Sequence, residues 1–490
     1  MGEAGESAEE DSDRSTLEFA SLSPDLFDAA PDVVAGRPVP FIKDVPIPSA
    51  MSIPLSERVA IPELGPDDDG REVVVAGWIQ EVRDLGGIAF VELRQGTETG
   101  QIVLPKGKVD EDTVDTLVEA NRESVAAIAG TVQESDEAPG GFEVLPDEAE
   151  LLNEAQTPLP MGVVDRVDTD VDTRLENRFL DVRKPEVQAI FAVRAAAVEG
   201  GRQWLQEEGF TEFTSPNIIG AASEGGTDIF EVQYFEETAY LSQSPQLYKQ
   251  MMMATGLDKV FEIAKYFRAE SHNTRRHLNE SSAFDCEVAF IDDEDDVLWV
   301  LENLVHAITS FVDENCTEEL ELLDHEVTVP DTPFPRVTYD EALDWTADDV
   351  EEEVAWGEDL STEAEYALGD IMEEKGHEYY FITKYPDECK PFYAQPEGEE
   401  LSRSFDLGKS GMEVTSGAQR VHDPDLLRQR IEEMGADTED FEDYLKPFTY
   451  GMPPHGGFGL GIERIVMEML DLHNIREAVL FPRDRDRLRP

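Results

Sequence analysis

Residues 259–291 read "KVFEIAKYFRAESHNTRRHLNESSAFDCEVAFI", and this stretch decides the fold. The runs at 259–270 and 282–291 have the composition of β-strands. The segment that joins them, residues 267–280, holds three arginines and two histidines in a chain with 39 basic and 109 acidic residues. This pattern predicts a β-hairpin whose basic loop reaches over an anionic ligand.

Arg268 ends the first of these strands, where a guanidinium fork can bind a phosphate through two hydrogen bonds. Glu270 follows two positions later and projects to the same face. Taken alone, this pair fits a solvated charged hairpin equally well. His272 and His277 do not have the HExxH spacing and no third ligand lies nearby, so a metal site through these histidines is not expected.

Two further segments carry charged residues beside glycines. Residues 451–482, "GMPPHGGFGLGIERIVMEMLDLHNIREAVLFP", predict a strand-like glycine run and then a helix with Arg464 in its first turn. They lack the βαβ context of a dinucleotide fingerprint. Residues 402–420, "SRSFDLGKSGMEVTSGAQR", place Asp406 and Glu413 on either side of a "GKSG" turn. Such a pair of carboxylates can bind Mg²⁺. Taken separately, however, packing of the helix on the sheet explains the first of these two segments, and chance pairing of carboxylates in an acidic chain explains the second.

The formal charge of −70 argues against nucleic-acid binding unless the acidity is a solvated surface adapted to salt. Arginine supplies 27 and lysine 12 of the basic residues, which favours a chain from a salt-rich cytoplasm. Three cysteines without a CxxC pair argue against a disulfide framework or a structural zinc site. No secretory leader or membrane-spanning run is apparent, so a cytoplasmic protein without a membrane partner is expected.

The pattern of elements predicts an α+β protein with several domains. Residues 1–66 are acidic and punctuated by proline, which predicts a disordered arm. Residues 67–155 hold five short strand-like runs and one helix, the outline of an oligonucleotide-binding (OB) barrel. Residues 156–178 form a linker, and 179–490 alternate amphipathic helices with strands of an antiparallel sheet.

Together the charged segments resemble the three signature motifs of class II aminoacyl-tRNA synthetases. Pro216 closes the first motif, "FRAE" with Arg268 is similar to the second, and "GLGIER" with Arg464 is similar to the third. The resemblance covers residues 72–490. The segments "EGGTDIF", "QSPQLYKQ", "RHLNE", "TSGAQR" and "LFPRDRDRLRP" resemble aspartyl-tRNA synthetases of the archaeal and eukaryotic type, and the acidity suggests a halophilic archaeon.

The resemblance implies that aspartate attacks the α-phosphate of ATP and that the aspartyl group then passes to the 3′ end of tRNA. It makes Arg268 and Arg464 the catalytic phosphate-binding residues. It assigns ATP to Arg268, Glu270, Arg276, His277, Leu278, Glu413 and Arg464. It assigns Mg²⁺ to Asp406, Glu413 and Ser416. It assigns aspartate to Glu224, Ser244, Gln246, Lys249, Asp285, Ser416 and Arg420, with Lys249 and Arg420 on the side-chain carboxylate.

In the barrel, the resemblance places the anticodon at Gln80, Arg83, Phe90, Gln101, Pro139 and Glu143, with Phe90 stacking on a base. Family members that charge only tRNA(Asp) differ at two of these positions from relaxed members that also charge tRNA(Asn). Gln80 resembles the strict type and Pro139 resembles the relaxed type. The sequence therefore leaves the choice of tRNA open.

Two other functions remain open at this point. An asparaginyl-tRNA synthetase shares the fold and the "RRHL" loop, but Pro245 and "TSGAQR" favour aspartate. A catalytically silent paralogue that binds tRNA is expected to lack a motif arginine or the Mg²⁺ carboxylates, and all four of these residues are present. The family is usually homodimeric through the first motif, so the resemblance also implies a homodimer.

Overall fold

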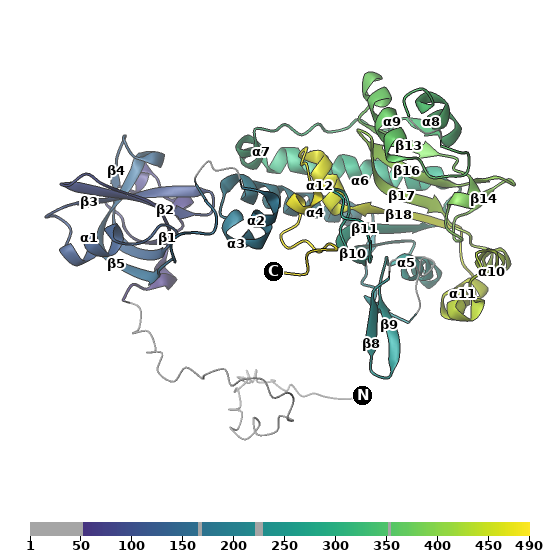
Figure 1. The fold of residues 1–490 in the computed structure, drawn as a ribbon, viewed down its shortest axis with the longest axis horizontal. Helices are drawn as coiled ribbons and strands as arrows, with labels where there is room; N and C mark the ends of the chain where they lie inside the picture. Colours follow the sequence, from purple (N-terminus) through teal and green to yellow (C-terminus); the bar gives the residue numbers. More distant parts are fainter. Residues whose placement is uncertain (1–51, 165–168, 221–228, 351–353) are drawn as a thin grey trace, which may run out of the picture. The chain divides into compact units, whose positions relative to one another are not determined.

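The computed structural model describes residues 52–164, 169–220, 229–350 and 354–490 of the 490-residue chain. The chain divides into two compact units, 1–52 and 53–490, and the first falls almost wholly outside the described residues. The fold below is that of the second unit, which contains a barrel and a larger sheet domain (Figure 1).

The first part of this unit is a closed barrel with the strand order β1-β2-β3-β5-β4. Its elements are β1 (Glu72–Asp84), β2 (Ile88–Gln95), β3 (Glu98–Pro105), α1 (Glu111–Val118), β4 (Val125–Glu134) and β5 (Phe142–Asn153). Only the β3–β5 pairing is parallel, as the closing of an OB-type barrel requires. The five strands and single helix predicted from the sequence are confirmed.

The chain just before β1 packs on the barrel. Ile61 and Leu64 are 3% and 8% exposed and belong to the barrel core, and the Ile61 N–H donates to Gln95 Oε1 at 3.0 Å. Three short 3₁₀ turns, at Leu55–Glu57, Ile61–Glu63 and Pro66–Asp68, lead into the first strand. The sequence assigned these residues to a disordered arm up to residue 66, whereas the structure orders the described part of it because its apolar side chains cover the barrel.

The second part is built on an eight-stranded sheet with the order β12-β13-β16-β17-β18-β11-β10-β6. Its strands are β6 (Thr211–Glu212), β10 (Lys259–Phe267), β11 (Glu280–Ala289), β12 (Arg336–Thr338), β13 (Tyr379–Thr383), β16 (Ser404–Lys409), β17 (Met412–Gln419) and β18 (His455–Gly461). The hairpin predicted around the basic loop is confirmed, since β10 and β11 pair in antiparallel register from Lys259 opposite Val288 to Phe267 opposite Glu280. The outermost pairs, β6–β10 and β12–β13, are parallel, so the sheet is antiparallel only in its interior.

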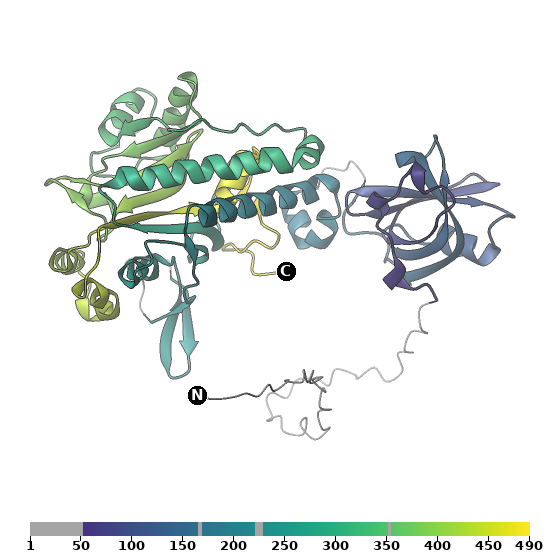
Figure 2. The ribbon, with the colours of Figure 1, turned by 180° about the vertical axis from the view of Figure 1, so that it is seen from behind.

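Two long helices, α4 (Pro185–Glu207) and α6 (Glu294–Asn315), run side by side along one face of this sheet (Figure 2). Glycines in α4 allow this close approach. A Cβ at Gly201 would lie 2.6 Å from the ring of Phe284 on β11, and one at Gly200 would lie 2.5 Å from Phe311 Cβ on α6. Helix α4 therefore packs through small residues as well as through its apolar stripe.

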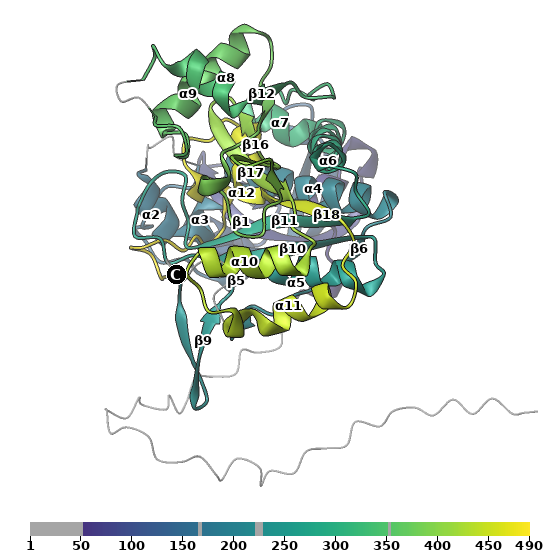
Figure 3. The ribbon, with the colours of Figure 1, turned by 90° about the vertical axis from the view of Figure 1, so that its right-hand side faces the viewer.

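Other helices cover the ends of the sheet. In Figure 3, α8 (Tyr339–Thr346) and α9 (Thr362–Glu374) lie at the top, and α5 (Gln246–Met252), α10 (Pro424–Glu433) and α11 (Glu442–Thr449) lie below. The remaining elements are α2 (Val171–Glu176), α3 (Arg178–Asp181), α7 (Thr317–Leu323), α12 (Ile462–Met469), β7 (Ile218–Ile219), β8 (Glu231–Tyr234), β9 (Glu237–Leu241), β14 (Pro396–Glu397) and β15 (Leu401–Ser402). Among the described residues, every helix is too short or too polar to cross a bilayer.

Candidate active site

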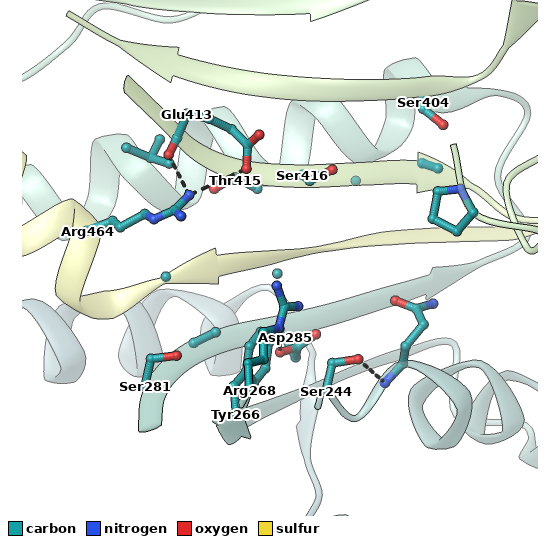
Figure 4. A pocket seen from close by; sticks show the side chains of 18 of the residues that line it. Ser244, Tyr266, Arg268, Ser281, Asp285, Ser404, Glu413, Thr415, Ser416 and Arg464 are labelled. Atoms are coloured by element: carbon teal, nitrogen blue, oxygen red, sulfur yellow. Dashed lines mark hydrogen bonds and ion pairs between the residues drawn. The ribbon is translucent and has the colours of Figure 1, made fainter. Parts of the chain in front are cut away.

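A cluster of polar side chains lines a cavity of about 610 Å³ over the centre of the sheet. Strands β10, β11, β17 and β18 and the start of α12 supply its walls (Figure 4). Several residues that line cavities here carry a buried polar atom without a hydrogen-bond partner among the described residues: Gln246 Nε2, Arg276 Nη2, Ser404 Oγ, Asp406 Oδ1 and Thr415 Oγ1. Because such atoms are rare in folded proteins, they indicate a site that is completed by a polar ligand.

Arg268 and Arg464 come from distant segments and both line this cavity. Arg268 follows β10, and its guanidinium lies 5.4 Å from the ring centroid of Tyr266. Arg464 lies in the first turn of α12, where Nη1 donates to the carbonyl oxygen of Glu413 at 2.9 Å and lies 3.5 Å from Glu413 Oε1 (Figure 4). Two guanidinium groups on one cavity can bind a polyphosphate.

Arg276, in the basic loop, faces the same cavity and is held by helix α9. Its Nη1 lies 3.3 Å from Glu365 Oε2, and its guanidinium carbon lies 4.4 Å from the ring centroid of Tyr366. Burial raises the pKa of Glu365 from 4.5 to about 7, and the Glu413 carboxylate adds to this shift, while Arg276 and Arg464 oppose it. Glu365 therefore gains and loses its proton near neutral pH, next to an arginine expected to bind phosphate.

His277, Leu278 and Glu270 complete the set assigned to ATP, and all three line the cavity. Burial lowers the pKa of His277; Glu270, whose Oε2 lies 3.8 Å from His277 Nε2, opposes this shift, and Arg464 adds to it. Leu278 is 6% exposed and belongs to a small apolar cluster. Leu278 thus anchors the basic loop in this apolar cluster at the border of the cavity.

The β16–β17 hairpin carries the residues assigned to Mg²⁺. Asp406 and Ser416 are cross-strand partners, and a register shift follows before Glu413 pairs with Gly408. All three line a side cavity of about 300 Å³ that shares Lys390 and Glu413 with the main cavity. Lys390 Nζ donates to Asp406 Oδ2 at 2.9 Å, which leaves Oδ1 of this buried carboxylate for a ligand. In the described part of the chain, no three His, Cys, Asp or Glu side chains form a metal cluster, so a cation here needs further ligands from a substrate.

The residues assigned to aspartate form a buried network of ion pairs. Lys249 Nζ donates to Asp285 Oδ1 at 2.8 Å and lies 3.6 Å from Glu287 Oε2. Arg420 Nε donates to Glu287 Oε1 at 3.1 Å, and Tyr266 donates to Asp285. The network contains two cations, Lys249 and Arg420, and two carboxylates, Asp285 and Glu287. Because these charges cancel, the pocket holds the two cations at modest electrostatic cost.

Ser244 and Gln246 lie at the start of α5 in the same pocket. Gln246 is 5% exposed, and its Nε2 atom has no partner among the described residues, so it can donate to a ligand. Glu224, which was also assigned to aspartate, lies outside the described residues. The structure therefore brings together six of the seven residues assigned to aspartate, with Ser416 at the border of the phosphate side.

Several site residues had no role in the sequence prediction. Glu287 is fully buried between Lys249 and Arg420, yet its segment "DCEVAF" carries only the alternation of a strand as a signal. Lys390 and Glu365 belong to segments without any recognised motif. Their roles depend on contacts between residues far apart in the chain, so no local pattern marks them.

Four of the six barrel residues assigned to the anticodon, namely Arg83, Phe90, Gln101 and Glu143, gather on the outer side of neighbouring strands. Arg83 on β1 is the cross-strand partner of Phe90 on β2, and Phe90 is half-buried. Gln101 Nε2 on β3 donates to Glu143 Oε2 on β5 at 3.0 Å. Such a surface, with one accessible aromatic ring among polar side chains, can stack with a base and bind its edge.

The two residues that distinguish the tRNA types lie elsewhere on the barrel. Gln80 sits at a bulge of β1, and its Oε1 accepts a hydrogen bond from the buried Arg94 Nη1 at 3.2 Å. Pro139 is exposed in the turn before β5. Their part in anticodon reading stays a prediction.

The family described as tRNA synthetases class II (D, K and N) matches residues 170–485. The chain belongs to this family. An OB-fold nucleic acid binding domain matches residues 73–152, in agreement with the observed barrel. Both parts of the predicted fold class, the OB barrel and the class II catalytic domain, are thus confirmed.

The relatives of this chain align with most of its length. The chain is 51% identical over 431 residues to the aspartate-tRNA(Asp) ligase of Pyrococcus furiosus, covering 87% of this chain and 98% of that protein. It is also 51% identical over 428 residues to the aspartate-tRNA(Asp/Asn) ligase of Methanopyrus kandleri, with 87% and 98% covered. The crystal structure of asparaginyl-tRNA synthetase from Pyrococcus horikoshii complexed with asparaginyl-adenylate is 34% identical, with a TM-score of 0.82, covering 89% of this chain and 100% of that one.

Proposed function

We propose that this chain is an aspartate-tRNA ligase that activates aspartate with ATP and transfers it to tRNA. The observation that carries the assignment is the buried pair of cations, Lys249 and Arg420, in a cavity that Arg268 and Arg464 also line. The 51% identity to aspartate-tRNA ligases supports it. Although Asp285 and Glu287 balance the charges of Lys249 and Arg420, the two cations offer a ligand only N–H donors, which favours a carboxylate over an amide and so aspartate over asparagine.

In the proposed first step, a carboxylate oxygen of aspartate attacks the α-phosphorus of ATP and pyrophosphate leaves. Arg268 binds the α-phosphate, Arg464 and Arg276 bind the outer phosphates, and their charges stabilise the negative charge of the transition state. The substrate carboxylate is already ionised, so no side-chain base is needed. In the second step a ribose hydroxyl at the 3′ end of tRNA attacks the aspartyl carbonyl and AMP leaves.

Mg²⁺ fits the donor set of Asp406, Glu413 and Ser416, because Asp406 Oδ1 is buried without a described partner and hard oxygen ligands suit this ion. When bound, it would neutralise phosphate charge during the displacement. Glu413 also accepts from Arg464 through its backbone oxygen, so the hairpin positions this arginine.

We also propose a homodimer that buries the apolar groove next to the first motif. Pro216, Phe213, Tyr248, Met251 and Tyr450 line this groove of about 420 Å³, and Tyr450 is 84% exposed. Light scattering after gel filtration measures the mass directly. A mass of one chain at micromolar concentration would contradict the dimer.

The function is tested by aminoacylation with labelled aspartate in molar KCl, with purified tRNA(Asp) and tRNA(Asn) in separate reactions. Charging of both establishes a relaxed enzyme, as in the Methanopyrus relative's name, and charging of tRNA(Asp) alone establishes a strict one. Charging of neither by folded protein would contradict the proposal and favour a silent paralogue. Arg268→Ala is the matched inactive control, expected to lose pyrophosphate exchange at least tenfold, which is about 1.4 kcal/mol.

A further inference from the structure

The basic loop, residues 268–279, is held largely by the end of the chain. The Arg268 N–H donates to the Asn279 carbonyl oxygen at 3.0 Å and closes the base of the loop. Beyond this, the Asn279 N–H donates to Arg483 O at 2.8 Å, and the Ile475 N–H donates to Arg275 O at 2.9 Å. The C-terminal segment that follows α12 thus runs beside the β10–β11 hairpin (Figure 1).

Arg476 is the centre of this contact. Its Nη1 donates to Thr274 O at 2.9 Å, its Nη2 to Asn273 Oδ1 at 2.6 Å, and its Nε to Asp484 Oδ2 at 2.6 Å. The side chains of Arg476 and Asp484 are 8% and 6% exposed. All three guanidinium nitrogens therefore serve acceptors on two segments, which a lysine ammonium group cannot reproduce with the same planar geometry.

Thr274 connects this arginine to the cavity. Its Oγ1 lies 2.6 Å from His277 Nδ1 and accepts from the Arg276 N–H at 3.2 Å. Arg276 and His277 both line the cavity. A shift of Thr274 is therefore passed directly to the ring of His277 and to the backbone of Arg276.

We propose that Arg476 and Asp484 are positioning residues for ATP: the C-terminal segment acts as a clasp that fixes residues 273–277 so that Arg276 and His277 face the phosphates. This inference rests on the proposed function for its kinetic consequence. Its structural consequence, an ordered loop, stands independently of the reaction.

If Arg476 and Asp484 only stabilised the fold, variants of these residues would change the kinetics differently from variants of positioning residues. Lys249 and Arg420, assigned to aspartate, are held by Asp285 and Glu287 and, among the described residues, form no ion pair with the clasp. Loosening the loop therefore weakens ATP binding selectively, whereas a general loss of folded protein lowers turnover without changing either KM.

The test compares Arg476→Lys and Asp484→Asn with the wild type in aspartate-dependent pyrophosphate exchange. Arg94→Lys is the matched control, since Arg94 is a 2% exposed arginine paired with Glu123 in the barrel. We expect Arg476→Lys to raise the KM for ATP at least tenfold, Asp484→Asn to raise it about threefold, and the KM for aspartate to stay within about twofold in both. The control should leave both KM values unchanged. Equal changes in the two KM values, or no change in folded Arg476→Lys, would overturn the proposal.

Hydrogen-deuterium exchange of the peptide that spans residues 271–279 tests the clasp with a measurement that does not depend on enzyme activity. We expect amide exchange in this peptide to become at least tenfold faster in Arg476→Lys and to stay at the wild-type rate in Arg94→Lys. An unchanged rate in Arg476→Lys refutes the clasp. A wild type that shows no pyrophosphate exchange, together with a loosened loop in the variant, refutes the proposed function and leaves the clasp supported.

Discussion

Lys249 offers the sharpest test of how the cavity distinguishes an acidic substrate. Its side chain is 1% exposed, and its ammonium group lies 2.8 Å from Asp285 and 3.6 Å from Glu287. Lys249→Met keeps much of the side-chain volume but removes the charge. Asp285 then retains the Tyr266 hydroxyl, and Glu287 retains Arg420.

The expected magnitude follows from burial. Removing one partner of a buried ion pair costs about 3–5 kcal/mol of unfolding free energy, because the carboxylates stay buried with one cation fewer. If the same charge contacts the substrate carboxylate, Lys249→Met also loses on the order of 3 kcal/mol of aspartate binding. This corresponds to a roughly 100-fold higher KM for aspartate.

The assay measures both quantities in one set of proteins: urea unfolding for stability and pyrophosphate exchange for the KM values. Lys265→Met is the control, because Lys265 is 50% exposed and lies 3.5 Å from Glu280, where a pair contributes at most about 1 kcal/mol. The double variant Lys249→Met/Asp285→Asn should regain part of the stability but not the affinity for aspartate. If Lys249→Met were as stable as Lys265→Met, or kept the wild-type KM for aspartate, the charge-balance reasoning would be wrong.

Three further predictions concern separate parts of the site. Glu365→Gln removes a carboxyl whose pKa burial raises from 4.5 to about 7. The folded wild type binds this proton more tightly than the unfolded chain does, so the wild type should lose stability relative to the variant as pH rises from 4.5 through 7. A constant difference between the urea unfolding midpoints of the two proteins from pH 5 to 8 would contradict this. Glu413→Gln should raise the Mg²⁺ concentration for half-maximal pyrophosphate exchange about tenfold, or about 1.4 kcal/mol, and an unmoved Mg²⁺ titration would remove this residue from the proposed metal site. Phe90→Ala should raise the KM for tRNA roughly 5- to 150-fold, which is equivalent to about 1–3 kcal/mol for one stacked base. Pyrophosphate exchange in the absence of tRNA should stay unchanged. A variant with the wild-type KM for tRNA would exclude stacking of a base on this ring.

The barrel and the two central hairpins were predictable from the sequence because their signals are local. Alternating apolar residues in 88–95 place one side of that strand in the barrel core, the β-branched and apolar run in 125–134 marks another strand, and turn residues separate the runs. The resemblance to the family motifs predicted the positions of Arg268 and Arg464, and both residues line the central cavity, while their roles in phosphate binding stay a prediction. The ordered residues before β1 were not predictable, because Ile61 and Leu64 form no periodic pattern of their own and are ordered only by the barrel surface that they cover.

The sequence by itself therefore determined the two domains, the family and the cationic character of the site. Only the tertiary structure decided which charges meet: Glu287 with Arg420, Glu365 with Arg276, and Arg476 with the basic loop. In a chain with 109 acidic residues, nearly every cation has many candidate partners by composition. Coulomb energy and desolvation depend on separation and burial in space, so the pairs that shape the site arise when the sheet brings distant segments to within hydrogen-bond distance.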